Sequence, residues 1–134
     1  MRLAAIDIGS NAARLLISDV VRNLEGKPAF NKLNQVRVPL RLGFDVFEKK
    51  EISPEKEAMI LKTIQAYKCL TDVYEVKYIK ACATSAMRDA INGRGIIERI
   101  KAETGIEIKI ISGDEEASII YENHFAEKIG RAHV

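Results

Sequence analysis

The chain has 134 residues, of which 47% are hydrophobic and 30% are charged, and its formal net charge is +2 at pH 7. This length is sufficient for one domain with a hydrophobic core. Acidic and basic residues are mixed along the chain, which argues against a strongly basic nucleic-acid-binding protein and against an acidic tail. No apolar run reaches membrane-spanning length, and Met1–Leu3 leads straight into a strand pattern without room for a secretory leader. We therefore expect a soluble cytoplasmic protein that binds neither DNA nor membranes.

The cysteines and histidines do not indicate a metal site. Cys69 and Cys82 lie in different apolar segments and form no CxxC pair, so we expect two small buried thiols in a reducing compartment, with a disulfide or a nucleophilic cysteine as the alternative. His124 and His133 lack the spacing of metal ligands, and neither is assigned to a metal.

The first part of the chain is predicted to form a meander of three antiparallel strands. A Gly-Ser-Asn cluster between two apolar runs indicates a tight turn between the first two strands. The segment Glu25–Pro28 interrupts the pattern before the third strand, and a loop is expected after Arg41–Gly43. The predicted strands are residues 3–8, 14–21 and 30–40.

The second part of the chain alternates helices with strands. Ser53 can cap a helix that begins at Pro54, and Glu55 and Glu57 favour the positive end of its dipole. The predicted elements that follow are a strand over residues 76–81, a helix between Gly93 and Gly105, a strand over residues 106–111 and a helix from Ser112. The order β-β-β-α-β-α-β-α predicts an α/β fold with a mixed five-stranded sheet, in which the first, fourth and fifth strands are parallel.

Polar segments follow the three parallel strands of this predicted sheet. They comprise the turn after Asp7, residues 82–88 and residues 112–116, and the strands that precede them are apolar. In open α/β sheets, ligands lie beyond the carboxyl ends of the parallel strands. The sequence therefore predicts a single site at this edge.

The turn after the first strand has the composition of an anion-binding loop. Gly9 can adopt a positive φ, which would allow successive backbone N–H groups to point in one direction. The carboxylate of Asp7 would repel a phosphate unless a divalent cation lay between them. The segment suggests a phosphate-and-metal loop, and an ordinary hairpin turn with a solvated Asp7 is the alternative.

The second segment contributes donors for an anion. The guanidinium of Arg88 has a rigid fork of donors that suits phosphate oxygens, although the alternative is a surface arginine paired with Asp89 or Glu115. Thr84 and Ser85 could donate to the same anion, or they could cap the turn that follows the strand.

The third segment contributes carboxylates. Ser112 and Glu115 have the S-x-x-E spacing of a capping box, which gives Glu115 a structural role. Glu116 has no capping role and could accept a proton from a water that attacks phosphorus. The alternative is that these acidic residues only stabilise a helix N-terminus, by about 0.3–1 kcal/mol each.

The sequence resembles a known family through motifs that occur in order: DIGSN at residues 7–11, RLG at 41–43, ATSAMRDAIN at 83–92 and ISGDEEA at 111–117. From Leu3 to about Phe125 the chain is similar to the N-terminal lobe of the exopolyphosphatase / guanosine pentaphosphate phosphohydrolase (Ppx/GppA) family. This resemblance implies a ribonuclease H-like, actin-like ATPase lobe. It also implies Mg²⁺-dependent release of the terminal phosphate from polyphosphate or from guanosine pentaphosphate.

The resemblance implies roles for particular residues. Gly9, Ser10 and Asn11 would form the first phosphate loop, with Asp7 near Mg²⁺. Arg88 would bind the phosphate chain, with Thr84 and Ser85 beside it as further phosphate-binding residues. Glu116 would be the catalytic base. Apart from these roles, a full-length protein could form a homodimer.

Two alternatives to a phosphohydrolase come from other functional classes. One is a regulatory lobe that binds a guanosine alarmone without hydrolysing it. The other is the N-terminal lobe of a small-molecule kinase with the same fold, but such kinases favour a Thr-rich turn where this chain has Ser10-Asn11.

The chain departs from the family pattern in three ways. Phe44 and Asp45 follow the RLG motif, where family members often have a second glycine. Nothing after Phe125 resembles the second lobe, so we expect residues 1–128 to be one lobe with little turnover by itself. Ile129–Val134 can be read from common sequencing-adapter DNA, and we expect these six residues to be non-native.

Overall fold

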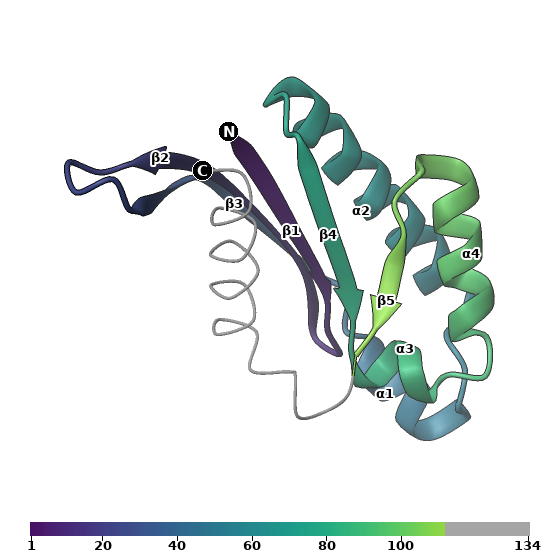
Figure 1. Ribbon diagram of the computed structural model, residues 1–134. Coiled ribbons are helices and arrows are strands. Elements are labelled where there is room, and N and C mark those ends of the chain that lie inside the picture. Colours follow the sequence, from purple (N-terminus) through teal and green to yellow (C-terminus); the bar gives the residue numbers. More distant parts are fainter. Residues whose placement is uncertain (112–134) are drawn as a thin grey trace.

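A mixed five-stranded sheet forms the centre of the computed structural model, which describes residues 1–111 (Figure 1). Its strand order is β3-β2-β1-β4-β5. The strands are β1 (Arg2–Ile8), β2 (Ala12–Arg22), β3 (Pro28–Pro39), β4 (Tyr78–Ala83) and β5 (Ile108–Ile110). The helices are α1 (Leu42–Lys49), α2 (Pro54–Val73), α3 (Ser85–Asp89) and α4 (Gly93–Thr104).

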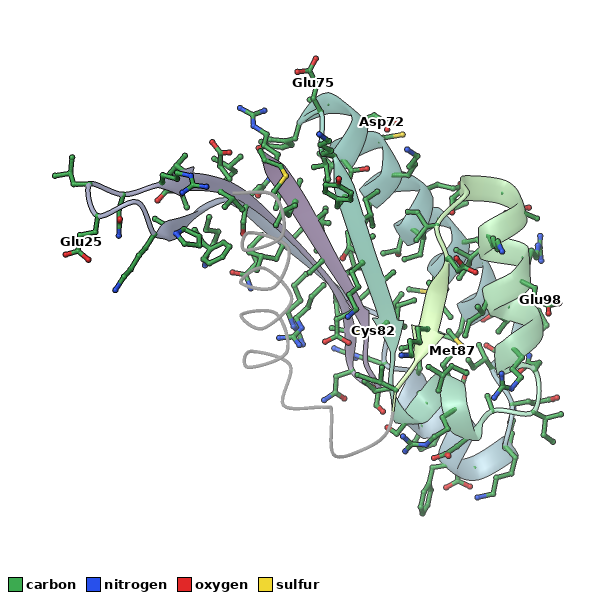
Figure 2. All side chains as sticks on the ribbon, viewed as in Figure 1. Glu25, Asp72, Glu75, Cys82, Met87 and Glu98 are labelled. Carbon is green, nitrogen blue, oxygen red and sulfur yellow. The ribbon has the colours of Figure 1, made fainter. Side chains whose placement is uncertain are left out.

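The pairing of the strands confirms the predicted mixed sheet. β1 is antiparallel to β2 and parallel to β4, β2 is antiparallel to β3, and β4 is parallel to β5. The β2–β3 hairpin extends beyond the rest of the sheet, with Glu25 at its tip (Figure 2). The predicted final helix from Ser112 lies outside the described residues.

The core lies between the sheet and the two long helices. Ile6 and Ile8 of β1 alternate with Asp7, and they belong to the same buried cluster as Ile64 of α2 and Ile96 of α4. This period-two alternation places Asp7 on the opposite face of the sheet. The shorter helices α1 and α3 lie at the end of the sheet where β1 and β4 finish (Figure 1).

Helix α2 begins as the sequence predicts and is fixed to the sheet by a buried tyrosine. The Ser53 hydroxyl accepts a hydrogen bond from the Lys56 N–H at 3.2 Å, and Pro54 is the first helical residue. Tyr67 is buried, and its hydroxyl donates to the carbonyl oxygen of Ala13 at 2.9 Å. This contact joins the helix directly to β2.

Two expected loops are helical instead. The segment after Arg41 forms α1 because Leu42 and Val46, four residues apart, are both buried, and Arg41 enters the helix with a φ of 55°. Part of the segment 82–88 forms α3, in which Ala86 and Met87 are buried. A spacing of four between apolar residues is a helix pattern, but it is short here and gives a weak signal.

One cysteine expectation is also wrong. Cys69 is exposed on α2, whereas Cys82 is buried on β4 as expected. Among the described residues, no helix is long and apolar enough to cross a membrane.

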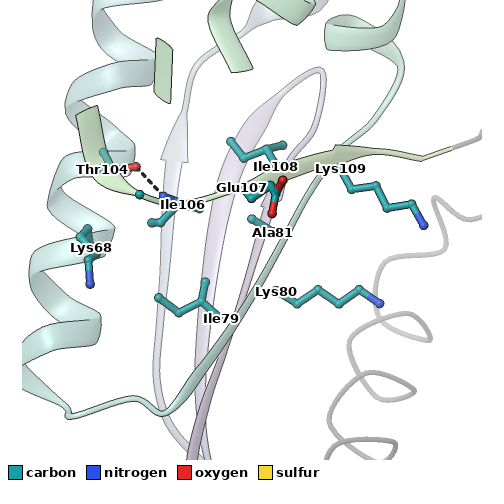
Figure 3. A pocket seen from close by; sticks show the side chains of 10 residues that line it. Lys68, Ile79, Lys80, Ala81, Thr104, Ile106, Glu107, Ile108 and Lys109 are labelled. Atoms are coloured by element: carbon teal, nitrogen blue, oxygen red, sulfur yellow. Dashed lines mark hydrogen bonds between the residues drawn. The ribbon is translucent and has the colours of Figure 1, made fainter. Parts of the chain in front are cut away.

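A wide hollow of about 780 Å³ opens where β4 and β5 separate. The pairing of β4 with β5 begins at Ala81 and Ile108, and the residues that precede these two are not paired with each other. Figure 3 shows Lys80 and Lys109 extending to the side away from Lys68 of α2. The polar hollow described below shares none of its lining residues with this one.

The junction of α3 and α4 depends on a glycine and an asparagine. A Cβ atom on Gly93 would lie 2.0 Å from the carbonyl oxygen of Met87, so only glycine fits. The Asn92 side chain accepts from the Ile52 N–H and donates to the Ile52 carbonyl oxygen, both at 2.9 Å. The end of the ATSAMRDAIN motif therefore fixes how α3 and α4 meet the chain before α2.

We expect Gly93→Ala to lower the free energy of unfolding by about 1–3 kcal/mol, because the backbone of Met87 must move. Gly95 lies in the same helix and has open space around its Cβ position. Gly95→Ala should therefore stabilise the protein by about 0.5–1 kcal/mol. Urea unfolding of the two variants measures both values, and equal effects of one sign would contradict the packing argument.

A second prediction concerns alkaline pH. Burial raises the pKa of Tyr67 from 10.0 to about 12, so the folded state holds this proton more tightly than the unfolded state does. The resulting stabilisation is complete below pH 10 and is lost as the pH rises from 10 to about 12. Tyr67→Phe should lose less unfolding free energy over this interval than the wild type does. Parallel curves of stability against pH would contradict the prediction.

Candidate active site

A polar hollow of about 360 Å³ lies at the carboxyl ends of β1 and β4. It brings together segments that are far apart in the sequence: the β1–β2 turn, paired positions of β2 and β3, and the start of α3. Most of the residues predicted for the site line it. The lining residues are Asp7, Gly9, Ser10, Asn11, Ala12, Arg14, Arg37, Thr84 and Ser85.

The β1–β2 turn, which lines this hollow, contains two backbone N–H groups that have no acceptor within residues 1–111. The Gly9 N–H is already used, because it donates to the carbonyl oxygen of Ala12 at 2.9 Å. Gly9 also lacks the positive φ that the sequence analysis expects. Within residues 1–111, the backbone N–H groups of Ser10 and Asn11 donate to no protein acceptor. These two groups are therefore the backbone donors that an anion could use.

The RLG motif supports the turn from the outside. The Arg41 N–H donates to the Asn11 carbonyl oxygen at 2.9 Å, and the Gly43 N–H donates to that of Ser10 at 3.0 Å. A Cβ atom on Gly43 would approach the Ser10 Cβ to 3.4 Å, so the two segments are closely packed. The motif therefore acts as a brace for the turn and does not itself line the hollow.

Two hydroxyls close the opposite side of the hollow. The Ser85 Oγ lies 2.8 Å from the Ser10 Oγ, which ties α3 to the turn. Thr84 is buried, and its side chain makes no capping hydrogen bond to α3. Of the two roles that the sequence leaves open for Thr84, helix capping is therefore not observed.

The carboxylate of Asp7 is neutralised by an arginine that the sequence analysis missed. The Arg14 Nη2 lies 2.5 Å from the Asp7 Oδ2, and the Asp7 side chain is 8% exposed. Cys82 approaches the other carboxylate oxygen, with its Sγ 3.9 Å away. The expectation that Asp7 requires a divalent cation is therefore incomplete, because Arg14 already places a positive charge there.

The donor set of the hollow is compatible with Mg²⁺. No group of three or more His, Cys, Asp or Glu side chains gathers anywhere in residues 1–111, and Asp7 is the carboxylate that lines the hollow. Mg²⁺ is usually held by one or two carboxylates together with substrate phosphates and several waters. Asp7 thus suits a Mg²⁺ ion that a phosphate ligand shares.

Arg88 does not line this hollow. Its Nη1 donates to the carbonyl oxygen of Ile111 at 3.2 Å, and its Nε lies 3.5 Å from the Asp89 carboxylate, the pairing considered as an alternative. Arg88 thereby links α3 to the residue immediately before the segment 112–116. Glu116 lies outside the described residues.

Comparison with known proteins shows the family of this chain. The model of the Ppx/GppA phosphatase family matches residues 19–129. The chain belongs to this family. It is 37% identical over 118 residues to a bifunctional 3-dehydroquinate synthase/phosphatase of Fusobacterium nucleatum, a match that covers 87% of this chain and 18% of that protein. It is 28% identical over 121 residues to exopolyphosphatase 1 of Mycobacterium bovis, covering 90% of this chain and 34% of that protein.

The similarity extends to solved structures of the family. A crystal structure of the Aquifex aeolicus Ppx/GppA family member has a TM-score of 0.78 and 32% sequence identity, covering 87% of this chain and 36% of that one. The expected actin-like α/β fold is confirmed by this similarity together with the strand order. The Ppx/GppA chain described here spans about a third or less of the length of these relatives.

The Asp7–Arg14 pair leads to a prediction for stability. Arg14→Met leaves a buried carboxylate without its nearest cation and should lower the free energy of unfolding by about 1–3 kcal/mol. Adding Asp7→Asn to this variant removes the uncompensated charge, so the double variant should be more stable than Arg14→Met alone. Urea unfolding of the four proteins in this cycle measures the coupling, and strictly additive losses would contradict it.

Proposed function

We propose that the protein releases the terminal phosphate from inorganic polyphosphate, or the 5′-terminal phosphate from guanosine pentaphosphate, in a Mg²⁺-dependent hydrolysis. One observation carries this proposal: free backbone donors of the DIGSN turn, two hydroxyls and a neutralised carboxylate meet in the hollow at the carboxyl ends of β1 and β4. The chain's membership of a phosphatase family and its similarity to proteins named exopolyphosphatases support it.

The hollow suits the binding of a phosphoryl group. The N–H groups of Ser10 and Asn11 would donate to its oxygens, and so would the hydroxyl of Thr84. Because Arg14 neutralises Asp7, the carboxylate would not by itself repel the ligand. Asp7 would hold Mg²⁺, which supplies further charge stabilisation of the phosphoryl oxygens when it is bound.

We assign the general base to Glu116, for the reason that its neighbour Glu115 has the capping spacing and Glu116 does not. A water oxygen would bond to the terminal phosphorus while the bridging P–O bond breaks. The water proton would pass to the Glu116 carboxylate, and the shortened chain would leave with its own oxygen.

We also propose that residues 1–128 act as one lobe of a larger enzyme. The short coverage of the relatives supports this division. The expected turnover of the 134-residue chain alone is low, because the Mg²⁺ ligands and the charge neutralisation that a second lobe would supply are not part of it. Catalytic tests therefore use the complete reading frame from which the chain comes.

The test of Glu116 is a charge-removing variant with a matched control. Glu116→Gln in the complete protein should lower kcat by about 10²–10⁴-fold, which is the usual contribution of a positioned general base. Glu107→Gln removes one carboxylate from an exposed position paired with Lys101 and should leave kcat unchanged. The measurement is Mg²⁺-dependent phosphate release from both substrates, with circular dichroism to verify folding. A loss of only two- or three-fold would contradict the assignment, and binding without turnover in the wild type would favour a regulatory lobe.

A further inference from the structure

A row of directly paired residues crosses the whole sheet beside the polar hollow. The strand registers pair Arg37 with Arg14, Arg14 with Asp7, Asp7 with Cys82, and Cys82 with Lys109. Directly paired residues project from the same face of a sheet. This is the face opposite α2 and α4, because Ile6 and Ile8 on either side of Asp7 point into the core.

The row contains a pair of arginines, and within residues 1–111 the carboxylate that lies beside this pair in the row is that of Asp7. Arg14 and Arg37 are directly opposite one another on β2 and β3, an arrangement that is destabilising for like charges. Asp7 offsets Arg14. Arg37 is exposed, and within residues 1–111 it makes no ion pair or hydrogen bond with a protein group. The positive charge of Arg37 is therefore available to an anion.

The hollow leads from a buried end toward Arg37. Asp7 and Thr84 at its inner side are buried, whereas Arg37 lies on β3, the edge strand of the sheet. The free N–H groups of Ser10 and Asn11 lie along the same lining. If an elongated ligand bound one anionic group at the turn, its second anionic group would therefore lie near Arg37.

We propose that Arg37 binds the second phosphoryl group of a ligand whose terminal phosphoryl group lies at the Ser10–Asn11 turn. Arg37 is then a specificity-determining residue that selects linked phosphoryl groups over a single phosphate. Its planar fork of donors suits two oxygens of one phosphoryl group. The inference rests on the proposed function, and it applies equally to an inorganic phosphate chain and to the phosphate chain of a nucleotide.

The experiment compares orthophosphate with inorganic tripolyphosphate on the 134-residue chain, using calorimetry at low salt. We expect the wild type to bind tripolyphosphate at least about tenfold more tightly, as one additional charge-assisted hydrogen bond would give. Arg37→Ala should remove most of this preference and leave the Kd for orthophosphate unchanged. Arg94→Ala removes the same charge from an exposed position on α4, outside the hollow, and should keep the preference.

Each outcome decides the inference. A wild type without the preference, or an Arg37→Ala variant that keeps it, overturns the role of Arg37 and leaves the phosphate turn intact. Failure of both anions to bind overturns this inference together with the proposed function. Guanosine triphosphate as a third ligand distinguishes an inorganic phosphate chain from that of a nucleotide. The inference is supported if Arg37→Ala weakens the binding of both tripolyphosphate and guanosine triphosphate, or of tripolyphosphate alone. If Arg37→Ala weakens the binding of guanosine triphosphate alone, the inference is overturned.

Discussion

The ion pair between Asp7 and Arg14 is the interaction on which the site depends. A carboxylate that is 8% exposed at the edge of a phosphate-sized hollow would be costly without a partner, and it would repel the ligands that the turn can bind. The partner comes from the next strand of the same hairpin, so the turn and the ion pair form together. The hairpin therefore supplies both the backbone donors and the charge balance that the proposed binding of an anion requires.

The surrounding motifs hold this hairpin in place and contribute few ligands. The RLG motif donates two backbone hydrogen bonds to the turn, and Ser85 joins it to α3. In the ATSAMRDAIN motif, Thr84 and Ser85 line the hollow, whereas Asn92 fixes the chain before α2. Within this one motif, some residues thus line the hollow and others support the fold.

The sheet is well predicted from the sequence, because only a few chain topologies are compatible with this order of apolar strands and crossover helices. The positions of the polar turns are predicted for the same reason. The position of Arg14 beside Asp7 could also have been predicted from the sequence, since a tight turn centred between Ser10 and Asn11 pairs these two residues. Helix α1 is not predicted from the sequence, because Leu42 and Val46 are its only buried residues and a single spacing of four is a weak helical signal.

Arg37 could not be placed from the sequence, and the reason is a defect in pairing. Counting back from the β2–β3 turn, where Arg22 pairs with Pro28, would set Val36 opposite Arg14 and turn Arg37 to the other face. The register shifts between Ile17 and Ser18, which brings Arg37 into line with Arg14. A bulge of this kind is known to redirect side chains near functional sites. One irregular position in the hairpin thus determines that the edge strand presents a positive charge to the hollow, even though the net charge of the whole chain is only +2.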